Sequence, residues 1–170
     1  MSGLGIQELP YRIATLIDLR DDRGRRLLLH RRKHPNRDLY SPVGGKLEMG
    51  IGESPAACAR REVLEETGLE LPMERFTLLG MISEVAFNGE AHWLMFFYRV
   101  EGAVELAETE FDEGRLEWHA DEDIDALPLP ESDSKVIWPM VRKHEPNGFF
   151  TVHIDCTTPE MTWAVQQSRF

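Results

Sequence analysis

The fold of this chain is decided by one stretch, GGKLEMGIGE at residues 44–53 followed by SPAACARREVLEETGL at residues 54–69. Ser54 is a good N-cap, because its hydroxyl can accept a hydrogen bond from an otherwise unpaired helix N–H. Pro55 at the first helical position sacrifices no useful donor, and Gly68 supplies a matching stop. The stretch therefore predicts a glycine-rich loop that leads into an acidic helix over residues 55–67.

One face of this helix gathers negative charge. At about 100° per residue, Glu62, Glu65 and Glu66 share a face. The opposite side carries Ala56, Ala57, Ala59, Val63 and Leu64. Carboxylates at these spacings repel one another, so a bound cation would give the face a purpose, and Mg²⁺ suits carboxylate and carbonyl oxygens. The alternative interpretation is an ordinary solvated acidic face.

The order of residues in this stretch resembles the Nudix box, over residues 45–69. The matching positions are Gly45, Glu53, Arg61, Glu62, Glu65, Glu66, Gly68 and Leu69. One departure is a longer connection between Gly45 and Glu53, with two extra residues around Met49-Gly50-Ile51. Glycines can absorb unusual dihedral angles. We therefore expect a bulge in the loop before the helix.

The resemblance implies roles for the residues of the box. Glu62, Glu65 and Glu66 would bind Mg²⁺, with Mn²⁺ as the alternative, or orient the attacking water. The carbonyl of Gly45 would add a further oxygen ligand. Arg61 would tether the box carboxylates through charge-assisted hydrogen bonds, and Glu53 would fix the loop against the helix.

Further candidates lie outside the box. The resemblance implies a distant acidic metal ligand just before the strand that contains Trp118. Glu113 is the first choice, with Asp112 and Glu110 as alternatives, and ordinary solvated acids as the other interpretation. For phosphate groups, Arg31 and Lys46 are the candidates, beside the neighbouring cations Arg32, Lys33 and Arg37. Cations at a strand edge can also serve only to prevent aggregation.

A nucleotide base needs aromatic faces and a polar partner. Phe149, Trp93 and Trp138 are candidates for stacking, and core packing is the alternative for each of them. Asp133 is the candidate that accepts a hydrogen bond from a purine edge, as acids in this segment do in the oxidised-purine hydrolases that the chain resembles.

The bulk composition excludes several classes of protein. The chain has 170 residues and a net charge of −11. That length indicates one domain over residues 1–170, and the charge argues against binding a nucleic-acid polymer. The longest apolar run, Trp93 to Tyr98, is far below the about 18 residues of a membrane helix. Two cysteines and no leader over Met1 to Pro10 favour a cytoplasmic protein.

The rest of the chain predicts a mixed α/β fold. A hairpin is expected from Tyr11–Leu19 and Arg25–Arg31, and a long aromatic strand over Ala91–Val100, buried on both faces at the sheet's centre. Further elements are expected as strands at 39–43, 76–85, 116–120 and 149–154, and as helices at 121–127 and from Asp133 or Ser134 to His144. The resemblance implies an α/β/α sandwich with a central mixed sheet.

The resemblance also implies an activity, cleavage of a nucleoside diphosphate linked to another group. The preferred hypothesis is a Mg²⁺-dependent pyrophosphohydrolase of nucleoside triphosphates, including oxidised purine ones of the oxidised-guanine type. The alternatives are an ADP-sugar or dinucleoside polyphosphate hydrolase, and a Nudix module that senses a nucleotide without cleaving it. The expected partner is a small nucleotide; the sequence does not determine the oligomeric state.

Overall fold

The computed structural model describes residues 8–170, so most of the segment Met1–Pro10 lies outside the described residues. Its strands are β1 (Tyr11–Asp18), β2 (Arg26–Arg31), β3 (Tyr40–Lys46), β4 (Phe76–Phe87), β5 (Ala91–Val100), β6 (Thr109–Phe111), β7 (Gly114–His119), β8 (Phe149–Asp155) and β9 (Thr162–Arg169). Its helices are α1 (Pro55–Thr67), α2 (Asp121–Ile124) and α3 (Trp138–His144), with short turns η1 (Met49–Ile51), η2 (Met73–Arg75) and η3 (Asp133–Ile137). In the part that is described, no helix has the length and apolarity to cross a membrane.

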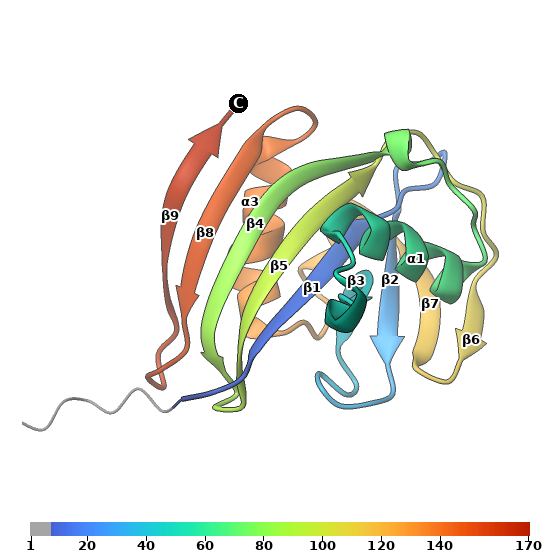
Figure 1. Ribbon diagram of the computed structural model, residues 1–170. Helices are drawn as coiled ribbons and strands as arrows, with labels where there is room; N and C mark the ends of the chain where they lie inside the picture. Colours follow the sequence, from blue (N-terminus) through green and yellow to red (C-terminus); the bar gives the residue numbers. More distant parts are fainter. Residues whose placement is uncertain (1–7) are drawn as a thin grey trace, which may run out of the picture.

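The strands form one mixed sheet between two layers of helix (Figure 1). Their order is β6-β7-β2-β3-β1-β5-β4-β8-β9. The pairs β1–β5 and β4–β8 are parallel, and the other pairs are antiparallel. Helix α1 packs on one face through Ala59 and Val63, and α3 packs on the other through Trp138 and Val141. The predicted α/β/α sandwich with a central mixed sheet is therefore confirmed.

The expected hairpin between the first two strands is wrong. After the turn that ends at Gly24, only an isolated bridge joins Arg20 to Arg26. Strand β3 inserts between β1 and β2 and pairs with both. The turn forms where its residues predict it, but β1 pairs with β3 and β5, and the local sequence does not report which strands become neighbours.

The long aromatic strand β5 lies one position from the middle strand, which is β1. It is not buried on both faces along its length, because His92, Trp93, Leu94 and Phe96 are only partly buried. Its apolar run serves two purposes, since Met95 and Phe97 lie in the core whereas Trp93 also borders a cavity. Strands β6 and β9 were not expected from the sequence.

The helix near the C-terminus begins differently from the expectation. Asp133 does not cap it, because the chain is already helical at Ser132, and Asp133 begins the wide π-type turn η3. This turn precedes Pro139 at the second position of α3. Proline lacks an N–H and disturbs the regular hydrogen-bond ladder, and a wider turn accommodates that defect. Its consequence is that the Asp133 side chain becomes buried.

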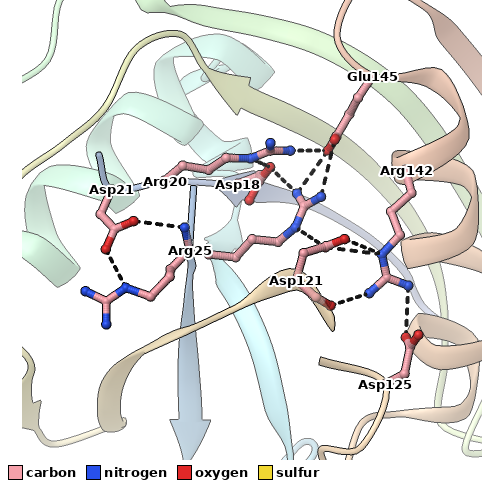
Figure 2. Close-up of polar contacts among 9 residues, drawn as sticks. Asp18, Arg20, Asp21, Arg25, Asp121, Asp125, Arg142 and Glu145 are labelled. Atoms are coloured by element: carbon pink, nitrogen blue, oxygen red, sulfur yellow. Dashed lines mark hydrogen bonds and ion pairs between the residues drawn. The ribbon is translucent and has the colours of Figure 1, made fainter. Parts of the chain in front are cut away.

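Charged residues from distant parts of the chain meet where β1 ends (Figure 2). We call this group the ion-pair network; it consists of Asp18, Arg20, Arg26, Asp121, Asp125, Arg142 and Glu145. Arg26 is 2% exposed and donates to Asp121 at 2.7 Å, to Glu145 at 2.9 Å and to Asp18. Its guanidinium also lies 4.9 Å from the ring centre of Trp138. The network ties β1 and β2 to α2 and α3.

Candidate active site

Helix α1 is built as its ends predict. The Ser54 hydroxyl accepts from the N–H of Ala57 at 3.1 Å. At the other end Gly68 adopts a left-handed φ of 75° and donates to the carbonyl of Leu64 at 2.8 Å. The division of faces is less simple than expected, because Leu64 is 45% exposed and Glu62 is largely buried. The helix therefore turns part of its acidic face toward the sheet.

The glycines of β3 create the space that these acids enter. Thr15 of β1 pairs with Gly45, so the glycine belongs to the sheet. A Cβ at Gly45 would lie 2.2 Å from Oε1 of Glu62, and a Cβ at Gly44 would lie 2.0 Å from the carbonyl oxygen of Thr15. At Gly44 the contact is with backbone, so only glycine fits, whereas a side chain at Gly45 would force the Glu62 carboxylate to move. The absence of both side chains lets the α1 carboxylates approach the β3 backbone.

Glu62, Glu66 and Glu113 form a group that we call the carboxylate cluster. Oε2 of Glu66 is buried and has no hydrogen-bond partner. Burial, and then the neighbouring Glu62 and Glu113 carboxylates, raise the pKa of Glu66 to about 9. Burial is also the main reason that the pKa of Glu62 is raised. Three acids with too little positive charge around them are the arrangement that a cation would stabilise.

Arg61 organises the start of the box. Its guanidinium donates to Glu53 at 2.7 and 2.9 Å, to Glu62 at 2.9 Å and to Glu65 at 3.2 Å. It also donates to the carbonyl of Lys46 at 3.1 Å, which ties the helix to β3. These hydrogen bonds lower the pKa of Glu53 to about 2. The supporting geometry expected for Arg61 and Glu53 is therefore present.

The extra residues of the loop leave the glycine strand undisturbed. They form the turn η1, with Met49 57% and Ile51 77% exposed, and Gly52 closes it with a left-handed φ of 66°. The backbone N–H of Glu48 donates to Glu53 at 2.8 Å across its base. The insertion thus projects outward, so Gly45 stays opposite Glu62.

The residues present fit a divalent cation. The donor set is carboxylate and carbonyl oxygen, which Mg²⁺ and Mn²⁺ prefer, and Glu66 has a buried oxygen without a partner. Within residues 8–170, no three His, Cys, Asp or Glu side chains are already arranged around one point. Oε1 of Glu62 is instead held by Arg61, which donates to it at 2.9 Å. Glu65 is the least suited of the box acids, since its side chain is 56% exposed and directed to Arg61.

A cavity of about 420 Å³ lies beside the carboxylate cluster. Seven of the candidate site residues line it: Arg31, Gly45, Lys46, Glu62, Trp93, Glu113 and Asp133. Neither of the two alternatives to Glu113 lines it, although Glu113 is itself exposed: Glu110 pairs with Arg32 at 2.8 Å at the surface, and Asp112 is exposed. The structure thus gathers residues that are as much as 102 positions apart, from Arg31 to Asp133.

The aromatic candidates separate into two groups. Trp93 lines the cavity, whereas Trp138 is fully buried beneath the sheet. The expectation for Phe149 has to be corrected, because it is not among the residues that line the cavity. It begins β8 and pairs with Arg169 of β9, and β4 and β5 separate that position from β1. Phe87 lines the cavity and was not anticipated.

Glu84 is the main cavity residue that was not anticipated from the sequence. It is 3% exposed, lies on β4 and lines the same cavity as Asp133. A signal was present, because Glu84 interrupts the apolar strand FTLLGMISEVAF. A buried acid in a central strand is uncommon unless a partner or a ligand accompanies it.

A second cavity, of about 740 Å³, adjoins the first. Both are lined by Asn36, Glu84, Phe87, Pro130 and Ser132. The second cavity extends toward the turn at Asn88 and the segment 156–161. Together they form a cleft that is longer than the catalytic region alone.

Comparisons with known proteins agree with this fold and this site. The model of the NUDIX domain matches residues 10–140. A protein of Bacillus subtilis strain 168, described as uncharacterized Nudix hydrolase YvcI, is 30% identical over 106 residues. That match covers 61% of this chain and 65% of the relative, so it spans less than two thirds of the relative's length.

Two solved structures show the same architecture. The mutator MutT protein from Bacillus halodurans is 26% identical, with a TM-score of 0.70, over 91% of this chain and 97% of that one. The NUDIX domain of Shewanella oneidensis NrtR, complexed with ADP ribose, is 16% identical, with a TM-score of 0.64, over 84% of this chain and 92% of that one; it shows the fold alone. The chain belongs to the Nudix family, and its fold is that of the MutT-type members.

Proposed function

We propose that this protein is a Nudix hydrolase that uses a divalent cation to cleave a nucleoside diphosphate linked to another group. The preferred substrate is a nucleoside triphosphate, including oxidised purine forms, and the products are a nucleoside monophosphate and pyrophosphate. One observation carries the proposal: the carboxylate cluster, with its unpartnered Glu66 oxygen, borders a cavity that also contains Arg31 and Lys46.

The reaction needs acidic side chains that hold a cation, and basic side chains beside them that bind phosphate oxygens. Cleavage of a phosphoric anhydride requires a water aligned with a phosphorus atom and stabilisation of charge on the phosphate oxygens. Glu62, Glu66 and the Gly45 carbonyl would hold Mg²⁺, which when bound lowers the pKa of a water and screens the phosphates. Arg31 and Lys46 would bind the remaining anionic oxygens.

Glu113 approaches the same region from the other side of the cavity. It lies just before β7, and its carboxylate acts electrostatically on both Glu62 and Glu66. Its backbone is held by the N–H of Arg32, which donates to the Glu113 carbonyl at 2.8 Å. We infer that Glu113 helps to hold the cation or a water bound to it.

The far end of the cavity suits a base. Trp93 and Phe87 offer apolar faces, and Asp133 offers a carboxyl group. These residues lie along the cleft from the carboxylate cluster, so the base would bind at one end and the reacting phosphates at the other. Trp93 takes the stacking role for which Phe149 was also a candidate.

The second cavity favours a second candidate function. An ADP-sugar or a dinucleoside polyphosphate carries a group beyond its diphosphate, and the adjoining cavity of about 740 Å³ offers room for it. Its lining includes the polar residues Asn36, Asn88, Thr157 and Thr158, which suit a hydroxyl-bearing group.

A substrate panel tests both candidates. The purified protein is incubated with Mg²⁺ or Mn²⁺ and with ordinary and oxidised nucleoside triphosphates, ADP-ribose and a dinucleoside polyphosphate, and the products are separated by chromatography. We expect monophosphate and pyrophosphate from a triphosphate, and no product from the Glu66→Gln variant. Preferential cleavage of ADP-ribose would support the second candidate. Tight binding without any product would instead indicate a nucleotide-sensing module.

A further inference from the structure

The two edges of the sheet differ in how they are protected. The edge strand β6 has three residues and carries the exposed Glu110, and a short charged edge discourages an incoming strand. The opposite edge strand, β9, has eight residues, with no charged side chain between Glu160 and Arg169. Among the residues that the structure describes, no strand pairs with its outer side (Figure 1). The backbone N–H and C=O groups on that side are therefore open to another strand.

Apolar side chains accompany this open edge. Trp163 is 47%, Val165 is 48% and Phe170 is 80% exposed. Trp163 pairs with Ile154 and Val165 pairs with Val152, and paired residues of antiparallel strands point to the same face of a sheet. Since Ile154 and Val152 belong to the core beneath α3, Trp163 and Val165 lie on the α3 side of the sheet. They form an exposed apolar strip beside the open backbone edge.

Contacts with α3 hold the end of β9 in place. The Ser168 hydroxyl forms a hydrogen bond with Nε2 of His144 at 2.6 Å. The His144 ring also stacks on Phe170, with the ring centres 4.9 Å apart. An edge that is already ordered loses little conformational freedom when another strand binds to it.

We propose that β9 pairs antiparallel with β9 of a second copy of this chain, so that the two sheets join across a two-fold axis. An antiparallel pair of identical strands is self-complementary, because the axis repeats each contact. Addition of a strand to an open edge is also an established mode of protein recognition. This interface lies apart from the carboxylate cluster and does not depend on the proposed function.

The alternation of side chains along β9 suits a pairing centred on Ala164. Trp163 of one copy then lies opposite Val165 of the other, and the axis repeats this pair. All four side chains point to the α3 side, so they form one apolar strip that association removes from water. Gln166, the extra residue of a bulge in β9, lies outside this central pairing.

The charges at the two ends of β9 favour the same register. Continued outward past the bulge, the pairing sets Arg169 of one copy opposite Glu160 of the other, just before β9 begins. Both residues are exposed, and within the described part of the chain neither forms an ion pair. Opposite charges that face each other on neighbouring strands stabilise the pairing of those strands. This charge complementarity and the open edge together indicate a second copy as the partner of β9.

The oligomeric state of the full chain tests the inference. Analytical ultracentrifugation over a dilution series should show a reversible dimer, against a mass of 19.6 kDa for one chain. Hydrogen exchange over residues 162–169 should slow as the dimer forms, because the outward N–H groups of β9 become hydrogen-bonded. A single chain at every concentration up to millimolar would overturn the inference. A dimer whose β9 amides exchange as fast as those of the monomer would overturn it as well.

A matched pair of variants locates the interface. Val165→Lys places a charge against Trp163 twice in each dimer, and should raise the dissociation constant by at least about tenfold. Ile51→Lys makes the same change on η1, where Ile51 is 77% exposed, and should leave the dissociation constant unchanged. Thermal unfolding shows whether both variants fold. Association that is lost in Ile51→Lys and kept in Val165→Lys would place the interface elsewhere and overturn the inference.

Exchanging the charges at the ends of β9 is an independent test. Glu160→Arg and Arg169→Glu each set like charges opposite each other, and each should weaken the dimer about tenfold. The double variant restores opposite charges in exchanged positions, and its dissociation constant should return to within about threefold of the wild type. Both residues are exposed, so these variants should fold even if Val165→Lys does not. A double variant that associates no better than either single variant would overturn the proposed pairing.

Discussion

The ion-pair network and the carboxylate cluster are both partly buried groups of charged side chains, and they differ in how their charge is balanced. In the network, Arg26 contacts Asp18, Asp121 and Glu145, so that acids and guanidinium groups alternate (Figure 2). One oxygen of Asp18 in the network has no hydrogen-bond partner among the described residues, but its other oxygen is held by Arg26 and Arg20. In the cluster, an oxygen of Glu66 likewise has no partner in the described part of the chain, and the nearest acids repel it. The charges of the network largely neutralise one another and stabilise the fold. The acids of the cluster lack such partners, and a bound cation would stabilise them.

The pKa values report the same contrast at Glu145 and Glu66, although at Asp18 burial still outweighs Arg26 and Arg20 and raises the pKa. Burial alone would raise the pKa of Glu145, but Arg26 and Arg20 hold it below its ordinary value. In the cluster nothing outweighs burial, and the pKa of Glu66 rises. The two regions therefore predict opposite results when a single charge is removed.

The largest effect is expected from Glu66→Gln. The substitution removes a cation ligand from the reacting centre, so kcat/KM with Mg²⁺ should fall about a thousandfold. The fold should persist, since glutamine keeps the size and shape of the side chain, and the Tm should stay about the same. Steady-state kinetics and thermal unfolding measure the two results. Unchanged kinetics would remove Glu66 from the cation site.

The next largest effect is expected from Arg26→Met in the ion-pair network. It leaves the buried Asp18 without its closest partner, and the free energy of unfolding should fall by about 3–5 kcal/mol. Denaturation in urea measures this change. The matched control is Arg25→Met, since Arg25 is 38% exposed and pairs only with Asp21, and it should cost at most about 1 kcal/mol.

The activity of the Arg26→Met variant completes the comparison between the network and the cluster. The kcat of the Arg26→Met protein that remains folded should equal that of the wild type, because the network lies outside the cavity lining. A loss of kcat without a loss of stability would show that the network acts on the reaction, and the contrast between the two regions would fail.

Stabilisation by Mg²⁺ should also distinguish the carboxylate cluster from the ion-pair network, and its effect on stability is smaller. At 100 times its dissociation constant, Mg²⁺ stabilises the folded protein by about 2.7 kcal/mol, or a Tm increase of several degrees. We expect this increase in the wild type and in Arg25→Met, and its loss in Glu66→Gln. An increase that survives in Glu66→Gln would place the cation elsewhere.

The smallest effect concerns acid stability. The folded pKa values of Glu145 and Asp121 lie below their ordinary values of 4.5 and 3.8. A depressed pKa contributes stability that is present above the unfolded value and is lost as the pH falls through the folded value. The contribution of these two acids to the free energy of unfolding should therefore decline below about pH 4.5, by on the order of 1 kcal/mol, because solvent partly screens these ion pairs. Asp18, whose pKa is raised, acts in the opposite direction. Glu145→Gln should flatten that decline in urea denaturation at pH 5 and below. An equally steep decline in the variant would contradict the assignment.

Much of the fold was accessible from the sequence because its signals are local. The caps Ser54 and Gly68 fix α1, and most strands appear where apolar residues and turn signals place them. The predicted hairpin is wrong for a different reason. Strand β3, which carries the buried Val43, pairs with β1 in place of β2. The prediction that Asp133 begins the helix as its cap is wrong, because the turn η3 changes the helical phase before Pro139.

The candidate site divides in the same way. The spacing of Glu62 and Glu66 on one helix and the nearby glycines were readable in the sequence. Phe149 was misplaced and Glu84 was missed, because the lining of the cavity depends on which strands are neighbours in the sheet.

The sequence by itself determined the acidic helix, its caps, the arginine that organises the box and the family. These features depend on residues within one stretch, where hydrogen bonds and helical periodicity act over a few positions. Only the tertiary structure decided that Glu84 and Asp133 line one cavity and that the extra loop residues project away from Gly45. Such contacts arise from strand order and burial, which couple residues far apart in the chain and leave no short-range pattern.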